Sequence, residues 1–458
     1  MSEPVDREPA GGRHHKPFDD TADVPVIGSE DVLAAPVNSY SGPPSAPRPP
    51  ARRSPWNRPR DRVVAALILV AALTGGLLIW AGSESRSTIS QTAQKGQPLP
   101  PAPDAVPGSL TELWRAPDGA VPVPVAGETT VVTASGGDVL GRDPLTGAVR
   151  WQYSRDLQLC TASRAWTHVL AVFRKDGLNN ESGCSEVVEL DPDTGHRTAQ
   201  RTGSAQLGTR LVSDGAYVTA YGPTLLNTWR DDLVETVEYG RVPALVNPGK
   251  QPRTGCSYGS VAAAAGQVGV LERCPRDQGD RITVLQAVPK DSDQPEVSYS
   301  QVLPGTSAQL VAMSGDNAAV AMPAQRLLLI YGPDGSQIAA YPLDLPAADL
   351  ARDPAGGVAS TSVTSSNVYW FTGSKLMALS RDTLTPLWTL GSALGPGVMF
   401  DHQLVVPIQG GLAVLNEQNG STIRTIGLDR HGYTGPVRLT AVGPVLLEQR
   451  GDTVVALR

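Results

Sequence analysis

The chain has few aromatic or charged residues and very little lysine. Aromatic side chains make up 5% of its 458 residues, charged ones 18%, and Lys occurs at six positions. Residues 83–458 carry 29 basic and 36 acidic side chains without a basic run, which argues against nucleic-acid binding. No amphipathic helical pattern of ten or more residues follows residue 110, so a helical bundle is excluded.

The sequence also lacks the common signatures of catalysis and metal binding. It contains no G-x-S-x-G, no C-x-x-C, no adjacent cysteine pair and no calcium loop of the D-x-[DN]-x-[DN]-G type. The histidines after residue 110 are widely spaced, and His14–His15 stands in a polar tail. We therefore expect no enzyme activity, no cofactor and no bound metal.

One long apolar run organises the N-terminal part. Residues 63–81 are uncharged and almost all apolar, long enough to cross a bilayer, and an arginine cluster precedes them within 52–62. The positive-inside rule then places 1–62 in the cytoplasm as a disordered tail, 63–82 as an uncleaved transmembrane helix, and the rest outside. A cleaved signal peptide is the alternative, but its apolar core would be shorter and nearer Met1.

The remaining chain has an all-β pattern. Residues 83–109 are rich in Ser, Gln and Pro and are expected to form a tether, so the folded domain is expected over 110–458. There, short runs of period two alternate with Gly, Pro, Asp and Asn turns. Strand–turn–strand units recur near Asp143, Asp191, Asp231, Asp291, Asp334, Asp382 and Asn419, at intervals of 37 to 60 residues. This spacing is typical of four-stranded propeller blades.

The stretch "DPLTGAVRW", residues 143–151, shows how each unit turns. Asp143 can accept backbone N–H bonds, Gly147 can adopt the left-handed backbone that closes the hairpin, and Trp151 lies in the outermost strand that follows. Related positions are Asp191, Gly195, Asp382 and Trp388. These residues are expected to have structural roles.

The two ends of this region predict a closed ring. Residues 451–458, "GDTVVALR", have the pattern of a third blade strand, and "LTELWRAP" around Trp114 has that of the strand after a turn. The N-terminal strand can therefore complete the last blade and remove an open sheet edge. Seven internal turns and this composite blade predict an eight-bladed β-propeller; seven blades are the alternative, because the unit over 240–300 is long and irregular.

These repeats resemble the PQQ-like β-propeller repeat family, whose consensus places an apolar strand before D-x-x-T-G-x-x-x-W. "DPLTGAVRW" fits that consensus in full, whereas "DPDTGHRTA" lacks the Trp and "RDTLTPLW" lacks the Gly. The family includes quinone-dependent dehydrogenases and non-catalytic scaffolds, so the resemblance implies the fold and leaves the function open.

The four cysteines all follow the apolar run, where an even number indicates disulfides. Three pairings are possible. Each local pair brackets an apolar strand, and hairpin neighbours bring such ends together, which favours Cys160–Cys184 and Cys256–Cys274.

Three functional hypotheses follow. The first is a single-pass inner-membrane protein whose propeller is a non-enzymatic scaffold or binding module in envelope assembly or envelope-lipid transport. Its partners would be envelope proteins or lipid or glycan precursors. The alternatives are a quinone-dependent dehydrogenase and a ligand sensor signalling through the cytoplasmic tail. Long insertions at 174–184, 240–258 and 288–297 are the expected places for specificity.

Overall fold

Helix α1 (Pro59–Ala81) contains the predicted apolar run and begins four residues before it. The computed structural model describes residues 58–81, 86–176, 182–242, 249–291, 294–315 and 317–458. Residues 1–57 of the disordered tail expected over 1–62 therefore lie outside the described residues, whereas 59–62 belong to α1. At ~1.5 Å per residue, α1 is about 34 Å long, enough to cross the ~30 Å hydrocarbon layer. Among the described residues it is the one helix long and apolar enough to do so.

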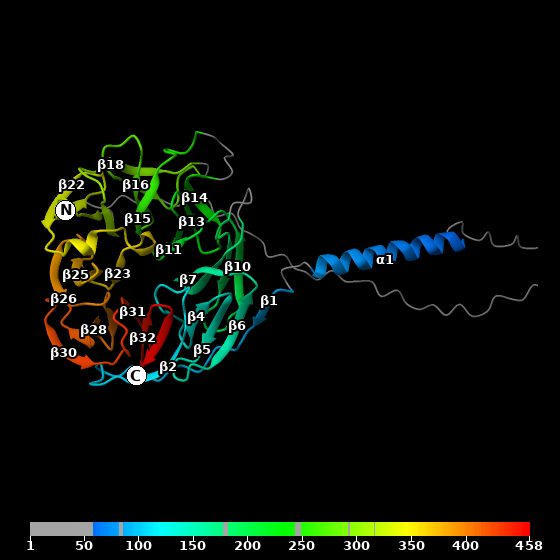
Figure 1. Ribbon diagram of the computed structural model, residues 1–458, viewed down its shortest axis with the longest axis horizontal. Helices are drawn as coiled ribbons and strands as arrows, with labels where there is room; N and C mark the ends of the chain where they lie inside the picture. The colour runs from blue at the N-terminus through cyan, green and yellow to red at the C-terminus, as the bar shows by residue number, and fades with distance from the viewer. Residues whose placement is uncertain (1–57, 82–85, 177–181, 243–248, 292–293, 316) are drawn as a thin grey trace, which may run out of the picture. The chain divides into compact units, whose positions relative to one another are not determined.

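The rest of the described chain forms eight antiparallel sheets, which are the blades of a β-propeller (Figure 1). The predicted number of blades is therefore confirmed. We number the blades by their innermost strands, from β3 in blade 1 to β31 in blade 8. In blades 2 to 7 the four strands follow in chain order from the centre outward.

The strands of the first four blades have the following bounds. Blade 1 contains β1 (Thr88–Gln91), β3 (Val125–Ala126), β4 (Val131–Ser135), β5 (Asp138–Arg142) and β6 (Val149–Arg155). Blade 2 contains β7 (Leu159–Ala165), β8 (His168–Phe173), β9 (Glu186–Leu190) and β10 (Arg197–Thr202). Blade 3 contains β11 (Arg210–Ser213), β12 (Val218–Tyr221), β13 (Leu225–Trp229) and β14 (Glu235–Gly240). Blade 4 contains β15 (Ser257–Ala264), β16 (Gln267–Arg273), β17 (Arg281–Gln286) and β18 (Val297–Val302).

The other four blades continue the series. Blade 5 contains β19 (Gln309–Ser314), β20 (Asn317–Met322), β21 (Leu327–Tyr331) and β22 (Gln337–Pro342), followed by the short helices η3 (Ala347–Leu350) and η4 (Ala355–Gly357). Blade 6 contains β23 (Ser360–Val363), β24 (Asn367–Phe371), β25 (Lys375–Ser380) and β26 (Pro386–Gly391). Blade 7 contains β27 (Val398–Phe400), β28 (Gln403–Ile408), β29 (Gly411–Leu415) and β30 (Thr422–Gly427). Blade 8 contains β31 (Val437–Val442), β32 (Val445–Arg450), β33 (Thr453–Leu457) and β2 (Glu112–Pro117).

The ring closes through blade 8, as the terminal sequences predict. Strand β2 pairs antiparallel with β33, and Trp114 lies opposite Ala456. The backbones of Thr111 and Arg458 extend this pairing through two reciprocal N–H···O bonds of 2.8 and 3.0 Å. The last sheet is therefore assembled from both ends of the propeller region.

The segment expected to be a free tether lies partly on the propeller. Strand β1 pairs with β6 over four residues and adds a fifth strand to the outer edge of blade 1. Further along, Val106 is buried in the core with 2% of its surface exposed, and Lys95 forms an ion pair of 2.7 Å with Glu128. The propeller thus includes residues N-terminal to Leu110.

The hydrophobic core lies between neighbouring blades. The middle strands are buried on both faces, as in β24 and β29, where all five residues are buried. One core cluster joins Ile330 of blade 5 to Trp370 and Met377 of blade 6. Outer strands such as β22 alternate between exposed and half-buried residues because successive side chains point to opposite faces of the sheet.

The antiparallel order divides the connections between two ends of the propeller. The turns between the third and fourth strands, such as 143–148, lie at one end, which we call the turn face. The connections between blades and the turns between the second and third strands lie at the other end. We call this end the plug face, after the connection over 343–359 that is described below. Of the long insertions, 174–184 and 240–258 belong to the plug face and 288–297 to the turn face; residues 177–181, 243–248 and 292–293 within them lie outside the described residues.

Candidate functional site

The Asp and Gly residues of the repeat form the hairpin turns on the turn face. The Asp143 carboxylate accepts hydrogen bonds from the backbone N–H groups of Leu145 and Thr146, both at 3.0 Å, while Gly147 N–H donates to the Asp143 carbonyl with φ +73°. Asp191 and Gly195 repeat this arrangement in blade 2. The Asp143 and Asp191 carboxylates thus accept hydrogen bonds within their own turns, which is a structural role.

Three repeat tryptophans each connect one blade to the next. Trp151 of blade 1 donates from its indole Nε1 to the Pro192 carbonyl in blade 2 at 2.9 Å, and a Cβ on Gly195 would lie 2.6 Å from its ring. Two further tryptophans make the same contact with the following blade: Trp114 with Pro144 and Gly147, and Trp388 with Glu417 and Gly420. The recurring spacing within the repeat therefore reflects packing between blades.

In blade 6 the turn begins earlier than the sequence pattern suggests. Ser380 N–H donates to Thr385 O and Leu384 N–H donates to Ser380 O, which are the bonds that Asp143 and Gly147 make in blade 1. Asp382, expected at the first position, lies two residues further along this turn. Leu384 replaces glycine at φ +58° and is fully buried. The backbone hydrogen bonds therefore place the first position of this turn at Ser380 and not at Asp382.

Two disulfides brace the plug face. Cys160 pairs with Cys184 and Cys256 with Cys274, the pairs that the spacing favours. In both cases the first cysteine stands at the start of an innermost strand, β7 or β15, and the second near the turn that follows the second strand of the same blade. Each disulfide therefore ties an inner strand to a loop on the plug face.

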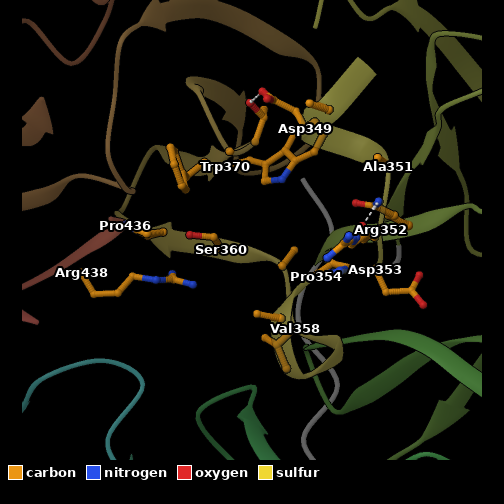
Figure 2. A pocket seen from close by; sticks show the side chains of 17 residues that line it. Asp349, Ala351, Arg352, Asp353, Pro354, Val358, Ser360, Trp370, Pro436 and Arg438 are labelled. Atoms are coloured by element: carbon orange, nitrogen blue, oxygen red, sulfur yellow. Dashed lines mark hydrogen bonds between the residues drawn. The ribbon is translucent and has the colours of Figure 1, made fainter. Parts of the chain in front are cut away.

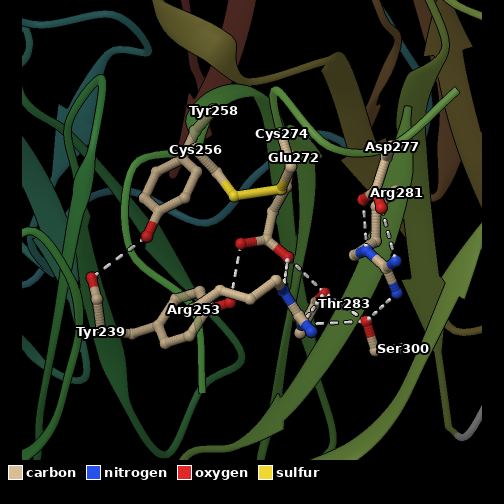
Figure 3. Close-up of a disulfide and its surroundings, with 10 residues drawn as sticks. All are labelled: Tyr239, Arg253, Cys256, Tyr258, Glu272, Cys274, Asp277, Arg281, Thr283 and Ser300. Atoms are coloured by element: carbon tan, nitrogen blue, oxygen red, sulfur yellow. Dashed lines mark hydrogen bonds and ion pairs between the residues drawn. A yellow bond between two sulfur atoms is a disulfide. The ribbon is translucent and has the colours of Figure 1, made fainter. Parts of the chain in front are cut away.

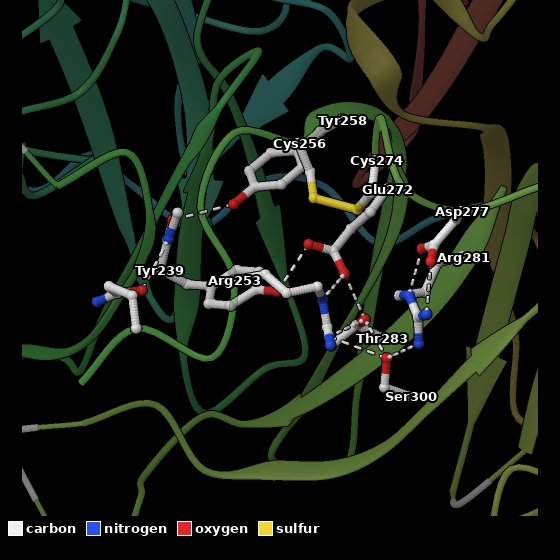
Figure 4. Close-up of polar contacts among 12 residues, drawn as sticks. Tyr239, Arg253, Cys256, Tyr258, Glu272, Cys274, Asp277, Arg281, Thr283 and Ser300 are labelled. Atoms are coloured by element: carbon white, nitrogen blue, oxygen red, sulfur yellow. Dashed lines mark hydrogen bonds and ion pairs between the residues drawn. A yellow bond between two sulfur atoms is a disulfide. The ribbon is translucent and has the colours of Figure 1, made fainter. Parts of the chain in front are cut away.

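A buried carboxylate lies beside the second disulfide (Figure 3). Glu272 is 1% exposed and accepts hydrogen bonds from Tyr239 Oη at 2.7 Å, Thr283 Oγ1 at 2.5 Å and Arg253 Nε at 3.2 Å. Burial and the neighbouring Glu272 charge raise the pKa of Tyr239, so this phenol stays neutral and donates. Figure 4 shows the network extending from Arg253 to Ser300.

This cluster does not supply the ligands of a metal site. Within the described parts of the chain, Cys256, Glu272 and Cys274 form the group whose ligand atoms lie close enough together, within 4.8 Å. The two sulfurs are bonded to each other and so offer no thiolate, and the carboxylate is already satisfied by three donors. The arrangement stabilises blade 4.

The connection from β22 to β23, residues 343–359, lies on the plug face, and we call it the plug. It leaves blade 5 and enters blade 6, yet Val358 forms a bridge with Val261 on β15. Gly357, at φ +70°, lies against the Tyr221 ring at the end of β12, where no Cβ would fit. The Asp353 carboxylate accepts two bonds of 2.6 Å from the Arg273 guanidinium. Blades 3 and 4 thus hold a segment that connects blades 5 and 6.

A cleft of about 560 Å³ lies beside the plug (Figure 2). The plug, the turn between β24 and β25, and the first strand of blade 8 form its walls. Seventeen residues line it, among them Asp349, Asp353, Ser360, Trp370 and Arg438. Its volume lies within the ~300–1,000 Å³ range of small-molecule sites.

The charged groups of this cleft differ in what they contact. Asp349 accepts bonds from the Thr372 hydroxyl at 2.5 Å and from the Ser374 hydroxyl and N–H at 2.8 and 3.2 Å. Asp353 is paired with Arg273. Arg438 has no hydrogen-bond acceptor or carboxylate partner among the described residues, and burial lowers its pKa to about 10. The cleft therefore contains a charge that the propeller leaves uncompensated.

Sequence reasoning missed both the plug and Arg438. The plug sequence, "LDLPAADLARDPAGGVA", gives a signal in its length and in its Pro, Asp and Gly content, which a simple link between neighbouring blades does not need. Arg438 stands in a strand of ordinary pattern, so nothing local distinguishes it from a surface arginine.

Comparison with known proteins confirms the resemblance to PQQ-like propellers. The family model PQQ_2, described as outer membrane protein assembly factor BamB, matches residues 69–225, which is 157 of 458 residues. A search of curated proteins gives no match. Two similar solved structures are BamB from Moraxella catarrhalis and a europium-containing methanol dehydrogenase. The first is 16% identical with a TM-score of 0.44 and covers 76% of this chain and 99% of its own. The second is 11% identical with a TM-score of 0.47 and covers 74% and 84%.

Proposed function

We propose that this chain is a single-pass inner-membrane protein whose extracytoplasmic propeller is a non-enzymatic binding module for envelope proteins. The observation that carries the proposal is the braced plug face. Two disulfides and the Arg273–Asp353 pair hold the loops of this face in place. A fixed surface of this kind reduces the ordering cost of binding a partner.

The absence of an assigned catalytic set within the described residues supports a binding role. The described cysteines are all paired in disulfides. The repeat Asp and Trp side chains are used in turns and between blades. In this proposal the propeller takes part in envelope assembly or in envelope-lipid transport, with lipid or glycan precursors as additional partners.

The membrane arrangement is part of the same proposal. Residues 1–62 form a cytoplasmic tail, 63–82 cross the membrane, and the chain after residue 83 lies outside. Two disulfides support this orientation because they persist in oxidising compartments. Protease treatment of intact spheroplasts should degrade the propeller region and leave the tail, and the reverse result would refute the orientation.

Site-specific photo-crosslinking in the native cell tests the binding role. A photoreactive residue replaces Arg352, which is exposed on the plug face, or Asp382, which is exposed on the turn face. We expect position 352 of the full-length protein to cross-link to an envelope protein identifiable by mass spectrometry, and position 382 not to do so. Equal products from both positions, or none from 352, would contradict the proposed binding face.

A further inference from the structure

The cleft beside the plug contains an arginine, Arg438, that has no carboxylate partner among the described residues. Both of its carboxylates are committed: Asp349 to hydroxyl and N–H donors, Asp353 to Arg273. Arg438 is half-buried, points into the space between Pro436, Ser360 and Pro354 (Figure 2), and meets no acceptor among the described residues. A guanidinium carries five donors and stays charged, so a desolvated one is costly without an anion.

We propose that this cleft binds an organic anion, with the Arg438 guanidinium holding its carboxylate or phosphate group and the apolar wall holding its body. This goes beyond the proposed binding of envelope proteins and does not depend on it. Arg binds both kinds of anion through two parallel N–H···O bonds, so the shared chemistry is a planar or tetrahedral oxyanion.

The walls of the cleft determine which uncharged group the anionic ligand can carry. Trp370 and Phe371 contribute from β24, and Val358 and Ala359 from the plug. A small number of polar groups in an otherwise apolar cleft fixes the orientation of a ligand, while apolar contact supplies affinity. Inorganic phosphate alone would leave this wall unused, whereas an aromatic or short aliphatic anion would cover it.

The position of Arg438 argues against a purely structural role. It lies on β31, the innermost strand of blade 8, while Ser360 and Trp370 belong to blade 6. Arg430, also in the last part of the chain, instead donates to both oxygens of Glu448 at 3.1 and 2.8 Å. Arg438 has no such carboxylate among the described residues.

Isothermal titration calorimetry of the full-length protein in detergent tests the proposal. The probes are phenyl phosphate, benzoate, inorganic phosphate, and benzyl alcohol as the uncharged analogue. We expect phenyl phosphate or benzoate to bind at least tenfold more tightly than either control probe. Binding of phenyl phosphate alone identifies a phosphate-bearing ligand, and binding of benzoate alone identifies a carboxylate. No heat from either aromatic anion at ~10 mM would overturn the proposal.

Variants separate recognition from folding. Arg438→Gln should reduce the affinity at least tenfold, Arg438→Lys should give an intermediate affinity, and Arg197→Gln, at an exposed arginine on β10, should leave it unchanged. Without ligand, Arg438→Gln should unfold at the same temperature as the wild type or at a higher one. Unchanged affinity in Arg438→Gln, or a lowered unfolding temperature with no affinity difference between Gln and Lys, would overturn the proposal.

Discussion

The contact between Gly195 and Trp151 provides a quantitative test of how neighbouring blades are joined. In Gly195→Ala the new methyl meets two penalties. At φ +71° an L-residue costs about 1–2 kcal/mol, and a Cβ placed 2.6 Å from the Trp151 ring forces an overpacking cost of about 1–3 kcal/mol. We expect Gly195→Ala to lower the free energy of unfolding by about 2–5 kcal/mol.

Gly136→Ala is the matched control because it carries the backbone penalty alone. Gly136 has φ +62°, and a Cβ added there would meet no atom within 4 Å. Its substitution should cost only about 1–2 kcal/mol. The difference between the two variants, about 1–3 kcal/mol, therefore measures the contact between blades.

Chemical unfolding of the full-length protein in detergent, followed by circular dichroism, gives both values. A double-mutant cycle completes the test: in a Trp151→Leu background the ring is gone, so Gly195→Ala should cost no more than Gly136→Ala. Equal losses in the two single variants, or an undiminished loss in the Trp151→Leu background, would refute the inter-blade interpretation.

Three further predictions concern single interactions. Burial first, and Glu235 second, raise the pKa of Glu238 from 4.5 to about 7, so the protonated form is favoured in the folded state; stability should be full below pH 4.5 and fall as pH rises through 7. With solvent screening we expect a loss on the order of 1–2 kcal/mol, measured by unfolding at pH 5 and 8 and smaller in Glu238→Gln. An undiminished loss in that variant would assign the effect elsewhere. Replacing Cys160 and Cys184 together by Ser should cost about 3 kcal/mol, and dithiothreitol should then add no loss from this pair. Trp388→Phe should cost about 1 kcal/mol through the lost bond to Glu417 O, and a midpoint equal to that of the wild type would show that the bond is not stabilising.

The blade count and ring closure could be predicted because they depend on local turn chemistry and on strand spacing. An Asp followed four residues later by Gly, as in Asp143 and Gly147, indicates a hairpin turn because the hydrogen bonds that define the turn join residues no more than five apart. Blade 6 shows where this reasoning fails: Ser380 makes the bonds expected of Asp382, and the sequence offers both at nearly the same place.

The remaining features depend on contacts between distant segments. Strand β1 joins blade 1 through backbone pairing with β6. Its sequence, "TISQ", has no alternation of apolar and polar residues from which a strand could be predicted. The plug meets Arg210 and Tyr221 from more than 130 residues away, and Arg438 reaches the same cleft from blade 8. Neither the spacing nor the composition of one segment carries such information.

The closure of blade 8 has a consequence for how the protein is made. The Thr111 hydroxyl donates to Arg458 O across 347 residues, so this contact closes the longest loop in the propeller. Until β33 is synthesised, β2 has no partner and one edge of β32 is unpaired. We therefore expect that pairing of β2 with β33 follows the formation of the more local hairpins of the propeller.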